Sequence, residues 1–252
     1  MMQDQIKQIQ TKLGLVPDGV AGPMTWNTIA AKLGISPIEA TLLSSATIIS
    51  DAAYKLIIKY EVGGGESYYN KCLKTPEYPG GESGVTIGIG YDLGYTTYTQ
   101  FASDWKSYLM PEIFTLLSQH LGKKGGAAKS IIHTLNNVVI PWSAAETVFK
   151  NCDIPRYIKQ TIAAFPTSDK LKPDAFGALV SLVFNRGGSM TGDSRLEMRN
   201  IRDAISGVIH VENVYQYIAD QFLSMKRLWI GKGLDGLLAR RGEEAVLIND
   251  CK

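Results

Sequence analysis

Gly84-Val85-Thr86-Ile87-Gly88-Ile89-Gly90-Tyr91-Asp92-Leu93-Gly94 is a stretch in which apolar residues alternate with small or polar ones. Successive side chains of a strand point to opposite faces, so this alternation predicts a strand or a hairpin. One face carries only Thr86 and Asp92, with Gly88 and Gly90 between them, which predicts a floor without side chains. Thr86 and Asp92 can serve one site only if the chain turns back near the two glycines, and glycine permits such a turn. An ordinary hairpin with a polar face fits the same pattern.

Helical spacing of apolar residues dominates the rest of the chain. A helix is expected from Asp51 to Tyr60, ended by the glycines at 63–65. Its expected buried stripe is Ala53, Leu56, Ile57 and Tyr60. Further helices are expected from Asp174 to Asn185 and from Val214 to Trp229. The predicted fold class is therefore α+β, mainly α-helical, with a single small β-hairpin.

The N-terminal residues form a separate pattern. Residues 6–13 predict a short helix ended by Gly14, and a Pro/Gly-rich turn precedes a second short helix that begins at Thr25. A unit of roughly 35 residues is below the usual size of a free-standing core. We assign residues 1–36 to this module, 37–50 to a linker and 51–252 to a second domain.

Composition narrows the classes of function. The 252 residues include 26 Lys and Arg against 24 Asp and Glu, a net charge of +2, which is too small a positive excess to favour nucleic-acid binding. No apolar run approaches membrane-spanning length, and the start has no signal-peptide pattern, so a protein made in the cytoplasm without stable membrane insertion is expected. The three cysteines and three histidines show no spacing typical of disulfides or zinc, and no metal or cofactor is expected.

Glu61 is the first candidate for chemistry. It follows Ile57 by one turn on the apolar stripe and lies at a helix C-terminus, where the helix dipole disfavours negative charge. Both effects favour a protonated carboxylic acid, which a glycosidase needs to protonate a leaving sugar oxygen. Taken alone, such a residue is also compatible with a solvated glutamate at a frayed helix end.

Together, Glu61-Val62-Gly63-Gly64 and the stretch 84–94 resemble the active site of phage-type lysozymes, most closely their pesticin-like branch. The resemblance implies a two-lobed catalytic domain with Glu61 as general acid and with Thr86 and Asp92 holding the attacking water. The more familiar branch places its Asp before the Thr, but no Asp lies between Glu61 and Thr86 here. Among the glutamates, Glu66 and Glu82 remain alternative carboxylates.

Two later motifs extend the resemblance to roughly residues 54–252. Val183-Phe184-Asn185-Arg186-Gly187 is similar to the motif that lines the opposite wall of the family's cleft, which implies substrate contacts by Asn185 and Arg186. Leu238 to Ala245 is similar to its closing helix. Gly88 and Gly90 are expected to offer bare backbone to the sugar. A capping or buried-pair role for Asn185 and Arg186 is an equal alternative.

The N-terminal module has its own resemblance. The stretches at residues 9–14 and 18–26 resemble the small helical peptidoglycan-binding domain of many wall hydrolases. Asp18, Gly19 and Trp26 are the residues assigned to it. Asp18 and the glycines also fit a purely turn-forming role, and Trp26 fits core and ligand contact equally well.

These resemblances imply a monomeric muramidase that cleaves bacterial peptidoglycan with inversion, without a cofactor, and acts in the periplasm after release from the cytoplasm. A modular phage endolysin is the first interpretation. An antibacterial effector or bacteriocin-type muramidase and an inactive wall-binding protein are the alternatives. A nucleophilic Cys72 paired with His120 or His133 is a weaker rival, because no helix start follows Cys72 to activate its thiol.

Overall fold

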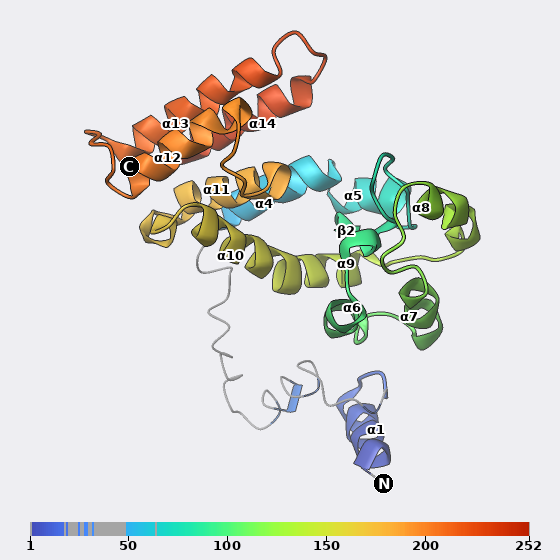
Figure 1. Ribbon diagram of the computed structural model, residues 1–252. Coiled ribbons are helices and arrows are strands. Elements are labelled where there is room, and N and C mark those ends of the chain that lie inside the picture. The colour runs from blue at the N-terminus through green and yellow to red at the C-terminus, as the bar shows by residue number, and fades with distance from the viewer. Residues whose placement is uncertain are drawn as a thin grey trace.

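The computed structural model describes residues 2–17, 19, 25, 28–29, 32, 49–63 and 65–251. It is mainly α-helical with one small antiparallel hairpin, as predicted (Figure 1). The long elements are α1 (Met2–Leu13), α4 (Asp51–Val62), α10 (Ile154–Ala164), α11 (Pro173–Arg186), α12 (Leu196–Ile205), α13 (Val214–Ser224) and α14 (Asp235–Asn249). The shorter helices are α5 (Glu66–Tyr68), α6 (Tyr98–Trp105), α7 (Pro111–Ser118), α8 (Gly126–Ile131) and α9 (Trp142–Val148). Single turns of 3-10 or π-helix join them: η1 (Tyr69–Leu73), η2 (Leu93–Tyr95), η3 (Ile132–Leu135), η4 (Phe149–Asp153), η5 (Ser168–Lys170), η6 (Asp193–Arg195) and η7 (Met225–Leu228).

The hairpin consists of β1 (Thr86–Ile87) and β2 (Tyr91–Asp92), with Thr86 opposite Asp92. The turn predicted at the glycines is confirmed, since Gly88 and Gly90 have φ angles of 58° and 70°. The extended stretch is shorter than the alternation suggested. Leu93 already begins η2, because the side chain of Asp92 accepts a hydrogen bond from the amide of Gly94 and closes a helical turn.

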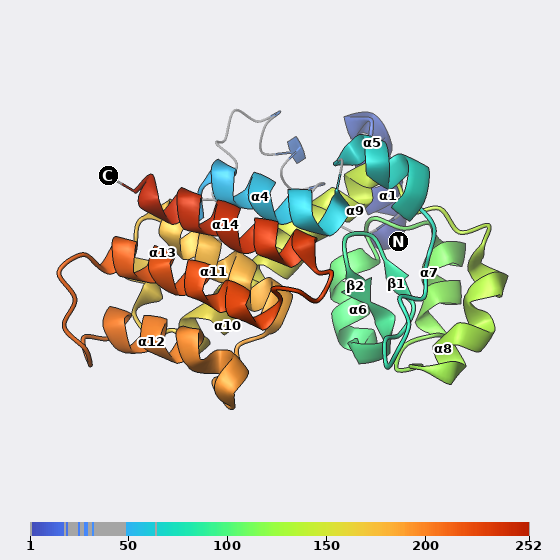
Figure 2. The ribbon, with the colours of Figure 1, turned by 90° about the horizontal axis from the view of Figure 1, so that it is seen from above.

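The apolar side of the hairpin is buried, as its alternation predicted. The five alternating residues are at most a few percent exposed: Val85, Ile87, Ile89, Tyr91 and Leu93. They share one hydrophobic cluster with Phe101 and Trp105 of α6 and with residues of α4, α7, α9 and α10. Figure 2 shows α6, α7 and α8 grouped around the hairpin, on the side away from α12 and α13. This cluster fixes the side of the hairpin that faces away from solvent.

Helix α11 forms the centre of the remaining helices. Its residues from Ala175 to Val183 are all buried, and it packs against α4, α10 and α14. A Cβ at Gly177 would lie 2.2 Å from the Cβ of Ala53, so the glycine allows α4 to approach α11 closely. The helix expected at residues 174–185 is confirmed. On α4, Ala53 and Ile57 are buried as expected, but Leu56 and Tyr60 are only half-buried because they lie at the edge of this contact.

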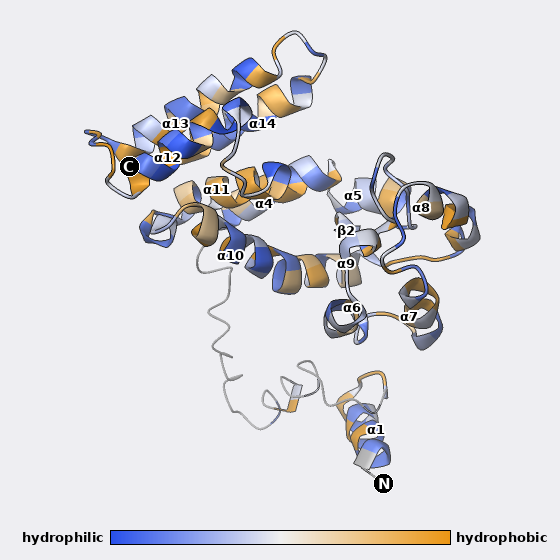
Figure 3. Ribbon diagram, in the orientation of Figure 1, coloured by the Kyte–Doolittle hydropathy of each residue, from blue (hydrophilic) through white to orange (hydrophobic). Residues whose placement is uncertain are grey.

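A second hydrophobic cluster joins α11 to α12, α13 and α14. The helix expected from Val214 to Trp229 is present as α13 followed by η7, with Ile218, Phe222 and Met225 buried. Hydrophilic residues alternate with hydrophobic ones along these outer helices, as Figure 3 shows. Among the described residues, no helix has the length and apolar character that crossing a membrane requires.

The N-terminal helix is confirmed and ends at Gly14, whose φ of 74° allows the amide of Leu15 to reach the carbonyl of Gln10. Most of the expected second helix and the linker up to residue 48 lie outside the described residues. Ser50 precedes α4, and its Oγ accepts a hydrogen bond from the amide of Ala53 and caps that helix. The proposed division into module, linker and catalytic domain stays a prediction.

Candidate functional site

Glu61 lies in the last turn of α4, one turn after the buried Ile57 and two residues before Gly63, which ends the helix with a φ of 66°. Its Oε1 accepts a hydrogen bond of 2.7 Å from Nη1 of Arg240. The side chain of Glu61 remains 21% exposed, whereas that of Arg240 is only 3% exposed. The carboxyl group therefore contacts a buried cation on one side and faces solvent on the other. This ion pair favours the charged carboxylate, so it works against the protonated acid that the apolar stripe and the helix end predicted.

Arg240 belongs to a buried charge cluster that ties α14 to α11. Its guanidinium donates to both Oγ and the carbonyl of Ser181, and its Nε is 3.3 Å from Oε1 of Glu244. Glu244 is fully buried and also forms an ion pair with Arg241 at 2.6 Å. Burial raises the pKa of Glu244, while the two arginines lower it. The sequence of α14 resembles the closing helix of the lysozyme family, but nothing in the sequence identified Arg240 as a partner of Glu61.

Glu61 and Arg240 line an open pocket of about 380 Å³ between the ends of α4 and α11 and the start of α14. Its lining residues are Tyr60, Glu61, Asn185, Gly233, Leu234, Asp235, Gly236, Leu237 and Arg240. Figures 1 and 2 show the C-terminal end of α4 directed toward the hairpin and α5. The pocket thus brings together two residues that were predicted separately, Glu61 and the exposed Asn185.

Thr86 and Asp92 are directly opposite each other, which brings their side chains to one face of the hairpin. They do not line the Glu61 pocket. The carboxylate of Asp92 is held by backbone amides: Oδ1 accepts from Gly94 at 2.7 Å and from Gly84 at 3.0 Å. On the edge of β1 that faces away from β2, the backbone of Thr86 exchanges two hydrogen bonds with the backbone of Glu77. Both predicted residues are half-buried, and the orientation of Asp92 is fixed by the hairpin backbone.

The two hairpin glycines differ in their surroundings. A Cβ at Gly88 would lie 2.8 Å from the ring of Trp105, so Gly88 is buried against an aromatic side chain and does not form the expected open floor. The alternation pattern failed here because Gly88 lies in the turn, where strand geometry no longer sets the direction of the side chain. Gly90 is exposed, and a Cβ there would meet only Phe184, at 3.9 Å. Phe184 precedes Asn185, so the hairpin turn adjoins the wall of the Glu61 pocket.

Arg186 lies outside that pocket and is engaged elsewhere. Its Nη2 donates to the carbonyl of Ser194 at 2.6 Å, and its guanidinium lies 5.1 Å from the ring centre of Trp229. Burial, reinforced by Arg195 and Arg241, lowers the pKa of Arg186 to about 10. These contacts are consistent with a structural role for Arg186, of which a capping or buried-pair role was the stated alternative, while its assignment to substrate binding stays a prediction.

The alternative carboxylates and the rival nucleophile have distinct positions. Glu66 and Glu82 are exposed, and the carbonyl of Glu82 accepts a hydrogen bond from Tyr95. Cys72 is exposed, whereas His120 is buried beside Lys123. Within the described part of the chain, no group of three or more His, Cys, Asp or Glu side chains is arranged to hold a metal ion.

In the N-terminal residues, Gly19 is buried with a φ of 77°, and its amide donates to Oε1 of Gln10 at 2.8 Å. The same side chain donates to Oγ1 of Thr25. Gly19 therefore has a turn-forming role, which was one of the two interpretations. Asp18 and Trp26 lie outside the described residues.

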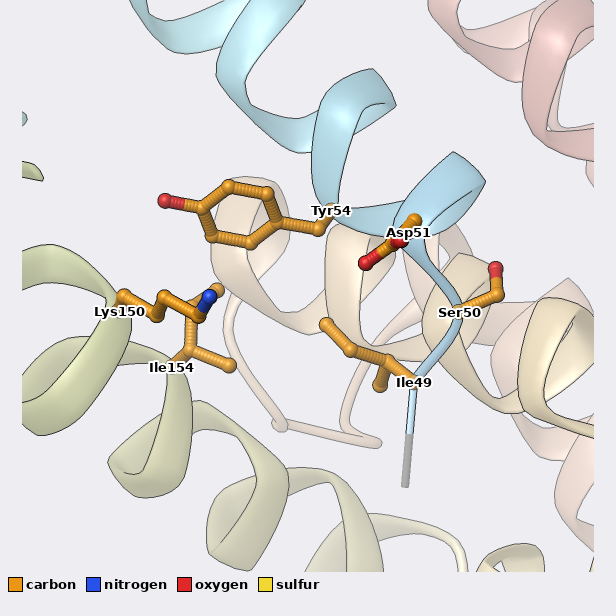
Figure 4. Close-up of a pocket in the computed structure, with 6 residues that line it drawn as sticks. All are labelled: Ile49, Ser50, Asp51, Tyr54, Lys150 and Ile154. Atoms are coloured by element: carbon orange, nitrogen blue, oxygen red, sulfur yellow. The ribbon is translucent and has the colours of Figure 1, made fainter. Parts of the chain in front are cut away.

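A second pocket is too small for a sugar. It measures about 20 Å³ and is lined by residues from the start of α4 and from η4 and α10: Ile49, Ser50, Asp51, Tyr54, Lys150 and Ile154 (Figure 4). A volume of that size corresponds to about one water molecule. A third pocket, of about 410 Å³, is open and lined by α7 and the residue after it: Pro111, Glu112, Thr115, Leu116 and Gln119. Of these three pockets only the one at Glu61 contains residues that the sequence predicted for a site, and it is therefore the candidate.

A family model described as a domain of unknown function (DUF8812) matches residues 57–156, a range that includes Glu61 and the whole hairpin. A comparison with curated proteins found no match.

Proposed function

We propose that the chain is a muramidase that hydrolyses the β-1,4 bond between N-acetylmuramic acid and N-acetylglucosamine in bacterial peptidoglycan. The observation that carries the proposal is the carboxyl group of Glu61, which lines an open pocket and contacts a buried guanidinium. Polymeric substrates need such an open site, because the chain must extend beyond the cleaved bond on both sides. The resemblance of the residues around Glu61 and the hairpin to phage-type lysozymes supports the same choice of substrate.

In the proposed reaction, protonated Glu61 donates its proton to the leaving sugar oxygen. The carboxylate that remains is then stabilised by Arg240, which is already in hydrogen-bond contact with it. Arg240 itself is fixed by Ser181 and Glu244 and needs no rearrangement during the step. Helix α14 thus supplies the proposed reaction with a cation that is already in position.

Thr86 and Asp92 hold the water that attacks the opposite face of the sugar, which gives inversion of the anomeric configuration. Their pairing across the hairpin supports a joint role, because both side chains point to the same face. The amides of Gly84 and Gly94 fix the direction of the Asp92 carboxylate. No cofactor enters this scheme, and Asn185 is the proposed sugar contact on the wall of the pocket.

The N-terminal module is proposed to hold the enzyme on the peptidoglycan polymer, as expected for a phage endolysin acting on the cell wall. Tethering raises the local concentration of the catalytic domain only for a substrate that the module can grip.

Mass spectrometry of the fragments released from purified peptidoglycan tests the proposal. Reducing N-acetylmuramic acid ends support the muramidase, and their absence from an identical digest with Glu61→Gln assigns them to this site. Release of free stem peptides would instead indicate an amidase. No release at all would indicate a wall-binding protein without activity.

A further inference from the structure

A partly buried polar cluster connects the hairpin to helix α10. We call it the Arg156 cluster, and it consists of Tyr91, Asp104, Asp153 and Arg156. Nη1 of Arg156 is 2.8 Å from Oδ2 of Asp104, and Nη2 is 2.6 Å from Oδ1 of Asp153. The hydroxyl of Tyr91 donates to the same Oδ2 of Asp104 at 2.8 Å. Three elements, β2, α6 and α10, thus meet at a single carboxylate.

Asp104 and Tyr91 of the cluster are shielded from water, whereas the side chain of Arg156 is 31% exposed and reaches them from the surface. Asp104 is 5% exposed and Tyr91 is 4% exposed. A charged group in such a place is tolerated only when it is paired. Arg156 is the cation that pairs with both carboxylates, and its guanidinium also lies 5.8 Å from the ring centre of Tyr91. Arg156 therefore links the strand and α6 to its own helix.

On α6, the residue after Asp104 holds the turn of the hairpin. The ring of Trp105 occupies the space beside Gly88 and meets Tyr91 edge-on, with 5.4 Å between ring centres. Asp104 and Trp105 therefore contact β2 and the turn together. Because Arg156 holds Asp104 in place, it also fixes these two contacts of α6 with the hairpin.

On α10, the residue after Arg156 connects to the other half of the site. The ring of Tyr157 packs on Phe184, with 4.2 Å between ring centres. Phe184 lies beside the hairpin turn, since a Cβ built at Gly90 would be 3.9 Å from its ring, and it precedes Asn185, which lines the pocket of Glu61. Adjacent residues of α10 thus contact the hairpin through Asp104 and the wall of the pocket through Phe184.

We propose that Arg156 is a positioning residue that fixes the hairpin, and with it Thr86 and Asp92, relative to the pocket of Glu61. Tyr91 pairs with Ile87 and directly precedes Asp92, so a displacement of Tyr91 displaces the predicted water-holding pair. The catalytic meaning of this inference rests on the proposed muramidase function. The mechanical link from Arg156 to the hairpin does not.

The test uses the full chain with Arg156→Gln. This substitution keeps a polar side chain but removes the positive charge and the simultaneous contacts with Asp104 and Asp153. Arg202→Gln is the matched control, because Arg202 has a similar exposure and pairs with Asp203 on α12 at 2.8 Å, away from the hairpin. Hydrogen exchange measured by mass spectrometry on peptides covering residues 84–94 reports the hairpin itself. Steady-state release of reducing ends from peptidoglycan reports kcat and KM.

We expect hairpin exchange to rise by about tenfold or more in Arg156→Gln and to stay at the wild-type level in Arg202→Gln. We expect kcat to fall by about a hundredfold, as for an ångström-scale misplacement of reacting groups, with little change in KM. If Arg156→Gln does not fold, Arg156→Lys decides by the same measurements, since a lysine makes one point contact and cannot bridge two carboxylates.

Wild-type exchange in the hairpin of a folded variant would overturn the proposal, as would faster exchange with an unchanged kcat. If the wild-type protein releases nothing from peptidoglycan, the proposed function fails, while the exchange measurement still decides whether Arg156 holds the hairpin.

Discussion

Glu61 and Arg240 are 179 positions apart in the chain, yet Oε1 of Glu61 accepts a hydrogen bond of 2.7 Å from Nη1 of Arg240. The contact joins the end of α4 to the first half of α14, and the arginine is buried while the glutamate is partly exposed. A buried guanidinium in contact with a solvent-accessible carboxyl group can stabilise the negative charge that the carboxyl group gains when it loses its proton.

We expect Glu61→Gln to lower the turnover of peptidoglycan by about a hundredfold or more, because glutamine keeps the size and the hydrogen bond but has no transferable proton. The free energy of unfolding should fall by no more than about 1 kcal/mol, since Arg240 retains Glu244 and Ser181 as partners. Reducing-end release and urea unfolding measure the two effects. Glu66→Gln, an exposed neighbour, is the control. Substantial residual turnover in folded Glu61→Gln would show that another group is the acid.

Asp92→Asn should cost more activity than Thr86→Ala. Removing the charge of Asp92 removes the proposed base and should lower the rate by about a hundredfold. The loss should be smaller for Thr86→Ala, because a water molecule can replace the hydroxyl group. Glu82→Gln should be mild, because Glu82 lies exposed beside the hairpin. Initial rates on purified peptidoglycan, with circular dichroism as a check on folding, decide the order. An inactive Glu82→Gln beside a nearly normal Asp92→Asn would reassign the base.

Gly88→Ala and Gly90→Ala separate packing from backbone conformation. Both residues have positive φ, so alanine costs each about 1–2 kcal/mol of backbone strain. Only at Gly88 does the new methyl group collide with Trp105, at 2.8 Å, which adds about 1–3 kcal/mol of overpacking. Thermal unfolding should therefore show the larger loss for Gly88→Ala. Equal losses would mean that Trp105 moves aside without cost.

Asp153 gives the protein a predictable dependence on pH. Its burial, opposed by Arg156 and reinforced by Asp104, raises the pKa of Asp153 from 3.8 to about 6. The folded state then binds the proton more tightly than the unfolded state. The contribution of this group to stability is accordingly full below about pH 4 and is lost as the pH rises toward and past 6.

Asp153→Asn should therefore be more stable than the wild-type protein at pH 7, because asparagine carries no buried negative charge. The difference should shrink as the pH is lowered through 6 toward 4. Urea unfolding of both proteins across this range measures it. Asp203→Asn, on the surface pair with Arg202, is the control and should show no such trend. A wild-type protein more stable than Asp153→Asn at pH 7 would contradict the prediction.

Several parts of the fold could be predicted because they depend on neighbours along the chain. The alternation of residues 85–93 identified the buried face of the hairpin, and the paired glycines identified its turn. Helical spacing located α11 to within one residue at each end. Gly63 marked the end of α4, which comes at Val62, one residue after Glu61. These patterns repeat every two or 3.6 residues, so a few adjacent positions are enough to show them.

The sequence by itself determined the hairpin and the helices α1, α4, α11 and α13, and its resemblance to a known family selected the candidate residues Glu61, Thr86 and Asp92. Only the tertiary structure decided what surrounds them. Arg240 reaches Glu61 from 179 positions away, Trp105 occupies the space beside Gly88, and Arg156 meets Asp104 from 52 positions away. The physical reason is that buried charges and close packing are resolved between elements that meet only after folding, and no local period in the sequence records which partners will meet.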